Sequence, residues 1–400
     1  MLRLLLLLLA SHAVAQPCTL TSGKELSEAR QKQFQEILSV SGDPAAVHFD
    51  MALGYAKLGN TQKALQELET ALSETPWLDP SAEKDLAPIA GCARFKALTQ
   101  KVQRKWPKVA VARQVFEVGP ADLIPEGLVA DSADGSLLMS SIYHRKIVRI
   151  ARDGKTSDFV QEGQDGLLSV LGMKVDPSDR SIWAASERSG ATALFHFDRN
   201  GRTLAKYVPK ETGKHGFNDL VLTPAGDVFV TDSLDRSVYR LRHGSDSLER
   251  ISLGARFYPN GIAISDDGKL IYVAHAFGIV CLDPTTHALA ELRSMPGVST
   301  AEIDGMYFRK GSLIAVQNGL GANRIVLLHL AADGKSVIGG RPLEFRSSLL
   351  DLPTTGAILN DKFYYVANTQ LNHEDEGKLK DPEQLQRIKI AELNLIQTTH

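Results

Sequence analysis

The sequence predicts a mainly β fold, a six-bladed β-propeller preceded by a small all-α domain of helical repeats. A polar pair, an apolar strand, a turn and a second apolar strand recur six times. The second residues of the polar pairs stand at positions 127, 172, 219, 261, 305 and 356, so the steps are 45, 47, 42, 44 and 51 residues. This period is typical of a four-stranded propeller blade. Before residue 105 the apolar residues follow helical spacing instead.

The last repeat lacks a strand. It offers apolar segments at 356–359, 363–368 and 387–393, but no obvious fourth. The segment from Val111 to Val118 reads as a strand outside the first repeat, so it could supply the missing strand and close the ring. The charged segment from Asn372 to Glu383 lacks apolar periodicity. We expect a solvated loop there, which could also lie over one face of the ring.

The helical domain is predicted from Leu26 to about Lys105. Its clearest unit, Ala45 to Leu78, has the spacing of a tetratricopeptide repeat. The residues at that spacing are Ala52, Tyr55, Gly59, Ala64, Leu68, Ala71 and Pro76. Flanking helices at 26–38 and 82–102 are expected to cover this unit, because one repeat cannot bury its own apolar face. We interpret the domain as a packing or spacer module; a peptide-binding groove for a protein partner is the alternative.

The first residues have the parts of a secretory signal peptide. A basic residue, a short apolar run and small residues precede Gln16. We therefore expect residues 1–15 to be a signal peptide, 16–106 a helical domain ending near Trp106-Pro107, and 107–400 the propeller. The protein is expected to be exported, to the periplasm or the extracellular space, with no membrane span. In an oxidising compartment Cys18 and Cys92 could pair, whereas Cys281 lies in an apolar strand pattern and is expected to be buried.

The charge balance bears on the kind of partner. The formal net charge of the 400 residues is −2, which provides no basic field for nucleic acid. A small-molecule substrate is therefore favoured, with a protein partner as a further possibility. The sequence also contains no G-x-S-x-G, H-E-x-x-H or P-loop motif, so it points to none of the enzyme classes that those motifs mark.

Polar residues at the start of the six inner strands are expected to form a ring at one end of the channel. The ring reads Glu126, Leu171, Asn218, Asn260, Asp304 and Thr355. Carboxylate and amide oxygens are the ligands that Ca²⁺ prefers, and the absence of histidine and thiol argues against zinc. Asn-Gly and Asp-Gly pairs could instead be simple turns, but each repeat already has its hairpin turn a few residues later.

A second polar column is expected where the following strands end. It consists of Ser141, Ser186, Asp232, His275, Gln317 and Asn368. Among these, Asp232, His275 and Asn368 are candidates to contact a substrate or to orient the metal ligands, and His275 could also act as an acid or base. Solvated or hydrogen-bonded strand ends are the alternative.

With these residues the chain from about Val109 resembles the senescence marker protein/gluconolactonase/luciferin-regenerating enzyme family of six-bladed propellers. The resemblance is carried by Pro125-Glu126-Gly127, Phe217-Asn218-Asp219, the segment Pro259 to Lys269, and Asp304-Gly305-Met306. It implies that Glu126, Asn260 and Asp304 bind a divalent cation, most often calcium. It further implies that Asp304 is the catalytic base and that Asn218 binds metal or substrate. The family's sugar-lactone hydrolases have an arginine where this chain has Gly216.

We therefore expect a calcium-dependent hydrolase of lactones or related esters, with the cation in the central channel polarising the carbonyl group. The metal ligands would be Glu126, Asn218, Asn260 and Asp304. The alternative is a propeller that binds a ligand or a protein without catalysis and whose metal is structural.

Overall fold

The computed structural model describes Cys18 and residues 20–75, 77–105, 108–319, 321 and 323–396. The expected signal peptide, Pro76 of the predicted repeat and the boundary at Trp106-Pro107 lie outside these residues. Within them, no helix is both long and apolar enough to cross a membrane.

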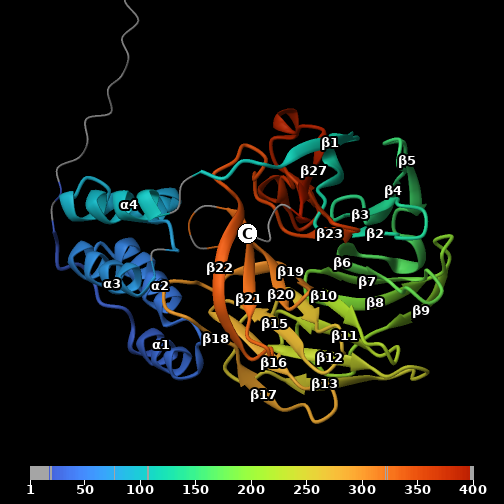
Figure 1. Ribbon diagram of the computed structural model, residues 1–400, viewed down its shortest axis with the longest axis horizontal. Helices are drawn as coiled ribbons and strands as arrows, with labels where there is room; N and C mark the ends of the chain where they lie inside the picture. Colours follow the sequence, from blue (N-terminus) through green and yellow to red (C-terminus); the bar gives the residue numbers. More distant parts are fainter. Residues whose placement is uncertain are drawn as a thin grey trace, which may run out of the picture.

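Six antiparallel sheets form a ring, as predicted (Figure 1). Blade 1 contains β2 (Leu128–Ala130), β3 (Leu137–Ser141), β4 (Lys146–Ile150) and β5 (Thr156–Val160). Blade 2 contains β6 (Ser169–Val175), β7 (Ile182–Arg188), β8 (Ala191–Phe197) and β9 (Thr203–Tyr207). Blade 3 contains β10 (Phe217–Leu222), β11 (Val228–Asp232), β12 (Ser237–Leu241) and β13 (Leu248–Ser252). Blade 4 contains β14 (Ile262–Ile264), β15 (Ile271–His275), β16 (Gly278–Leu282) and β17 (Leu289–Glu291).

The last two blades depart from this simple order. Blade 5 contains β19 (Ile303–Arg309), β20 (Ser312–Gln317), β21 (Arg324–Leu330) and β22 (Ser336–Phe345), and β18 (Arg293–Ser294) pairs in parallel with β22. Blade 6 contains β23 (Gly356–Leu359), β24 (Lys362–Val366), β27 (Ile388–Asn394) and β1 (Arg113–Val118). A short ribbon of β25 (Glu374–Asp375) and β26 (Lys378–Leu379) interrupts this blade between β24 and β27.

Strand β1 closes the ring, which confirms the expectation for the segment Val111 to Val118. It pairs antiparallel with β27, from Arg113 opposite Glu392 to Val118 opposite Ile388. Val118 is buried in the core between the last and first blades, whereas Val111, just before the strand, is exposed.

The packing of β1 gives a stability prediction. Val118→Asn places an unpartnered amide in an apolar core and should lower the free energy of unfolding by about 3 kcal/mol. The same substitution at exposed Val111 should change it by less than about 0.5 kcal/mol. Urea unfolding followed by fluorescence measures both variants. Equal effects at the two positions would mean that β1 is not packed into the ring.

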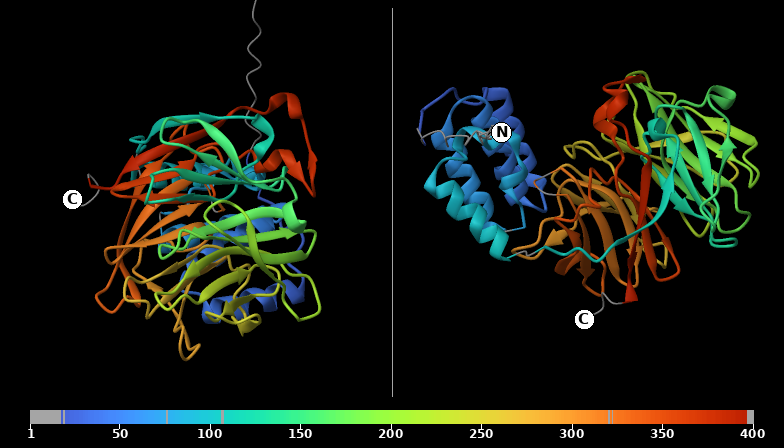
Figure 2. Two further views of the ribbon diagram at one scale, coloured as in Figure 1. Left: turned by 90° about the vertical axis from the view of Figure 1, so that its right-hand side faces the viewer. Right: turned by 90° about the horizontal axis from the view of Figure 1, so that it is seen from above.

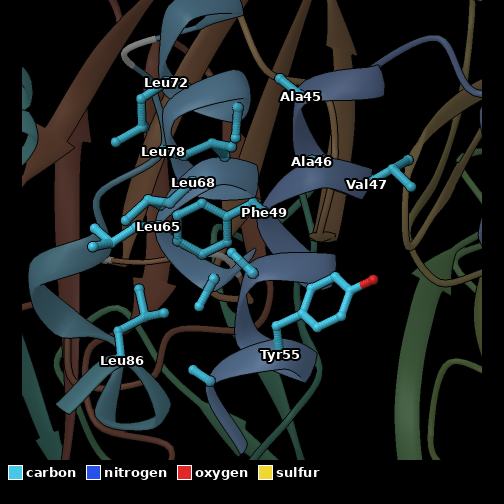
Figure 3. Close-up of a cluster of buried hydrophobic side chains, with 14 of the residues drawn as sticks. Ala45, Ala46, Val47, Phe49, Tyr55, Leu65, Leu68, Leu72, Leu78 and Leu86 are labelled. Carbon is cyan, nitrogen blue, oxygen red and sulfur yellow. The ribbon is translucent and has the colours of Figure 1, made fainter. Parts of the chain in front are cut away.

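The helical domain contains α1 (Glu28–Val40), α2 (Pro44–Lys57), α3 (Thr61–Glu74) and α4 (Ala93–Lys105). Gly59, with a φ of 71°, makes the turn between α2 and α3, and Phe49, Leu65 and Leu68 point into the space between these two helices (Figure 3). The last flanking helix begins at Ala93 and not at residue 82. Two 3₁₀ segments, η1 (Pro80–Ala82) and η2 (Lys84–Ile89), precede it, and Pro88 inside η2 lacks the N–H that an α-helix needs.

The structure contains the disulfide and the buried free cysteine that the sequence analysis considered. Cys18 and Cys92 form a disulfide, which ties the start of the described chain to the residue before α4. Cys281 is free and buried in β16.

The helical domain packs against one side of the ring, next to blades 4 and 5 (Figure 2). Its apolar core includes Phe277 and Ala301 from the propeller, and partly buried Phe257 and Ala276 pack against it. These residues belong to loops on the face of the ring where the inner strands begin. The helical domain therefore borders this end of the ring, the mouth.

Candidate functional site

The residues of the predicted ring lie where the six inner strands start. Glu126 and Asn260 lie two residues before the first residues of β2 and β14, whereas Asn218 and Asp304 are the second residues of β10 and β19. The pairing register shifts between Phe217 and Leu220, and again between Ile303 and Met306. Such irregularities are frequent next to active sites because they re-aim side chains.

Glycines of the polar pairs allow the inner strands to converge. A Cβ atom on Gly127 would lie 2.0 Å from the carbonyl oxygen of Leu171, and one on Gly261 would lie 1.9 Å from that of Asp304. At the last junction, the hydroxyls of Thr354 and Thr355 both donate to the carbonyl oxygen of Glu126. The pairs therefore mark a close approach between neighbouring blades and are not turns.

Asp304 and Asn260 present oxygens without partners. Asp304 is 8% exposed, and its Oδ2 accepts a 2.7 Å hydrogen bond from Nδ2 of Asn318. Its Oδ1 and the Oδ1 of Asn260 are buried without a hydrogen-bond partner. Because an unpartnered buried oxygen is costly, the pair fits a site that a cation would complete.

The carboxylates of Glu126 and Asp304 influence each other. Burial raises the pKa of Glu126 well above its usual value, and the charges of Asp304 and Glu187 raise it further. Burial also raises the pKa of Asp304 to about 7, although the hydrogen bond from Asn318 and the neighbouring amide of Asn260 act in the opposite direction. A divalent cation bound between the two carboxylates would stabilise their ionised forms and so lower both pKa values.

The pKa of Asp304 gives a prediction for metal binding. Below pH 7 protons should compete with Ca²⁺ for this carboxylate, so Ca²⁺ affinity should fall by up to about tenfold per pH unit for each proton displaced. Calorimetric titrations between pH 5 and 8 measure this dependence. Asp304→Asn should flatten the slope by one proton. An equally steep slope in the variant would contradict the prediction.

Asn218 is joined to the next blade through a serine. Its Nδ2 donates to Oγ of Ser233 at 3.2 Å, and this hydroxyl donates to the carbonyl oxygen of Pro259 at 2.6 Å. Pro259 directly precedes Asn260, so the amides of blades 3 and 4 are positioned together. Asp219, the next residue, forms an ion pair with Lys174 at 3.1 Å.

Two of the three candidates of the second column, Asp232 and Asn368, use their polar atoms in other hydrogen bonds, whereas Nε2 of His275 is buried without a hydrogen-bond partner. Asp232 is fully buried, accepts from the backbone N–H of Gly216, Leu234 and Asp235 through Oδ1, and bonds Nδ1 of His215 through Oδ2 at 2.8 Å. His275 lies 3.5 Å from Glu291 through Nε2, beside the helical domain. Asn368 bonds the backbone of Arg387 and Lys389. These side chains can orient the loops of the mouth.

At three positions of the second column, the residue that follows the predicted one is the one that acts on the ring. Ser233, which bonds Asn218, follows Asp232, and Asn318, which bonds Asp304, follows Gln317. Glu187, whose charge raises the pKa of Glu126, likewise follows Ser186. Successive side chains along a strand point to opposite faces, so a column counted one residue too early misses these contacts.

One further group has metal-like geometry. Ligand atoms of His215, Asp232 and Asp235 lie within 4.8 Å of one another, so an acidic metal site is possible there. Its atoms already have partners, however, since Asp232 bonds His215 and Asp235 pairs with Arg250 at 2.5 Å. The group therefore fits a hydrogen-bonded support for the loop before Asn218.

Residues 124–311 match the family described as SMP-30/Gluconolactonase/LRE-like region. The propeller contains an SMP-30/gluconolactonase/LRE-like region. The match spans Glu126, Asn218, Asn260 and Asp304, so all four ring residues lie within the SMP-30/gluconolactonase/LRE-like part of the chain. No curated protein sequence matches the chain.

Solved structures are similar to this chain at low sequence identity. Virginiamycin B lyase from Staphylococcus aureus is 15% identical with a TM-score of 0.50, over 71% of this chain and 99% of that chain. A gluconolactonase from Xanthomonas campestris is 15% identical with a TM-score of 0.49, over 72% and 97%. The aldose sugar dehydrogenase from Streptomyces coelicolor is 18% identical with a TM-score of 0.49, over 71% and 97%. At these identities the likeness concerns the fold alone.

Proposed function

We propose that the protein is a metal-dependent hydrolase of lactones or related esters. The family match supports a lactonase-type function at the family level. The observation that carries the proposal is the pair of buried, unpartnered oxygens on Asp304 and Asn260 beside the carboxylate of Glu126.

A hard divalent cation such as Ca²⁺ fits the oxygen ligands of Glu126, Asn218, Asn260 and Asp304. When bound, such a cation polarises a carbonyl group and stabilises the negative charge that develops on its oxygen. Asp304 can offer Oδ1 to the cation and take a proton from the attacking water on the lone pair of Oδ2 that Asn318 leaves unused. Ser233 fixes the amide of Asn218 toward the same mouth.

The surroundings of Gly216 bear on the substrate. The side chain of Leu234 would lie 3.0 Å from a Cβ atom at this position, and the N–H of Gly216 is used by Asp232. Gly216 supplies no cation where the sugar-lactone hydrolases of the family carry an arginine. The carboxylates of Glu187 and Asp219 lie near Glu126, but Arg188 and Lys174 offset their charges. We infer that aldonolactones are not the substrates of this protein.

The test is a panel of lactones and esters assayed with Ca²⁺ and again with a chelator. Hydrolysis that disappears with chelator and returns with Ca²⁺ supports the proposal. Binding of Ca²⁺ without hydrolysis of any substrate would instead favour the non-catalytic propeller with a structural metal. We also propose that the protein works outside the cytoplasm, and the Cys18–Cys92 disulfide supports an oxidising compartment.

Glu126→Gln separates metal binding from catalysis. The variant keeps an oxygen ligand but loses a charge, so Ca²⁺ affinity should fall by about 10- to 100-fold, and excess Ca²⁺ should restore most of the rate. Rates measured across a Ca²⁺ titration decide this. A rate that stays low at saturating Ca²⁺ would show that Glu126 also takes part in the chemistry.

A further inference from the structure

The helical domain contacts the propeller through buried polar groups as well as through its apolar core. Ser41 donates to the carbonyl oxygen of Phe277, and Arg346 pairs with the fully buried Asp79. The backbone N–H of Gly321 donates to Glu83 at 2.7 Å. Buried polar contacts require defined geometry, so the domain sits on the ring in a fixed orientation.

Trp77 reaches into the end of β20. Its Nε1–H donates to Oε1 of Gln317 at 3.0 Å, and the same oxygen accepts from Nε of Arg324 at 2.8 Å. Arg324 also donates to the carbonyl oxygen of Trp77. All three side chains are at least 96% buried. Gln317 is therefore locked between the helical domain and the propeller.

Gln317 also holds the segment 299–301, which precedes β19. Its Nε2 donates to the carbonyl oxygens of Ser299 at 3.2 Å and Ala301 at 2.8 Å. A second residue of the helical domain holds the same segment. Asp43 accepts through Oδ2 from the hydroxyl of Ser299 and from the N–H of Thr300. Its other oxygen caps α2 by accepting from the N–H of Ala46.

These contacts converge on Asp304 from both sides. The segment held by Asp43 and Gln317 leads, three residues after Ala301, to Asp304 itself. Gln317 is followed by Asn318, which donates to Oδ2 of Asp304. We propose that the helical domain positions Asp304, with Trp77 and Asp43 as positioning residues that act through Gln317 and the segment 299–301. The role of Asp304 in metal binding rests on the proposed function; its positioning does not.

Trp77→Phe and Asp43→Asn test this proposal in the full-length protein. Trp77→Phe keeps an aromatic side chain but removes the N–H group that donates to Gln317. Asp43→Asn leaves one carboxamide oxygen, which cannot accept hydrogen bonds both from the start of α2 and from the segment 299–300. The control is Asn60→Ala, which removes the cap of α3 by Asn60 and touches nothing in the propeller. Hydrogen exchange of residues 299–306 and the Kd for Ca²⁺ are measured for all three variants.

We expect both positioning variants to exchange faster at residues 299–306 and to bind Ca²⁺ about 10-fold more weakly, with less than a twofold change in the control. Unchanged exchange, or faster exchange with an unchanged Kd, would overturn the proposal. An equal loss of affinity in the control would also overturn it, because general loosening of the domain would then suffice. If the wild-type protein bound no Ca²⁺ and hydrolysed no lactone, the proposed function would fail, and the exchange comparison alone would decide the positioning.

Discussion

Asp304→Asn is expected to lower turnover by about 100-fold or more, because the variant loses the group that accepts a proton from the attacking water. The carboxylate oxygens have different neighbours, since Oδ2 accepts from Asn318 and Oδ1 is free for a ligand. The single oxygen of asparagine can serve only one of them, so Ca²⁺ binding should weaken as well, by about 10-fold. Rates must therefore be measured at saturating Ca²⁺.

Asn318→Ala is the matched comparison for this variant. It removes the hydrogen bond to Asp304 but keeps the carboxylate, so turnover at saturating Ca²⁺ should fall by only about 10-fold. Asp304→Asn with wild-type turnover at saturating Ca²⁺ would rule out Asp304 as the base.

Gly261→Ala is expected to lower the free energy of unfolding by about 3 kcal/mol or more and to impair Ca²⁺ binding at the same time. Its new Cβ atom would lie 1.9 Å from the carbonyl oxygen of Asp304. The start of β14 and β19 must therefore move apart, which separates the proposed ligands Asn260 and Asp304. Urea unfolding and Ca²⁺ titration measure the two effects.

Gly339→Ala is the control for this substitution. Gly339 also lies in a strand, β22, but a Cβ atom there meets only His329 at 3.5 Å or more. The change should stay within about 0.5 kcal/mol. Equal effects at Gly261 and Gly339 would contradict the role of the close approach.

The repeat period predicts much of the fold because each blade is a local unit. The strand turns and the polar pairs recur at a spacing that one four-stranded sheet requires, and the missing strand of the last repeat points to Val111 to Val118. The docking of the helical domain has no such signal. Asp43 and Trp77 stand outside any periodic pattern, and their partners lie more than 200 residues away.

For the candidate site, the ring of Glu126, Asn218, Asn260 and Asp304 could be predicted because all four residues hold equivalent positions. Their supporting residues were harder to identify. Ser233 and Asn318 lie one residue beyond the predicted column, and side-chain alternation makes a shift of one residue decisive. The glycine pairs were ambiguous because glycine serves turns and close approaches equally well.

The pairing of β1 with β27 also has a consequence for how the chain folds. Arg113 and Glu392 are 279 positions apart, so the last blade cannot form until nearly the whole chain has been synthesised. Contacts between such distant segments form slowly, because the entropy of closing the loop must be overcome first. The helical domain is synthesised first, but its apolar core is complete only after Phe277 and Ala301 of the propeller have been synthesised and have packed against it. Ring closure is therefore expected to be the slow step of folding, and chains that stop before β27 should expose an unpaired strand edge and aggregate.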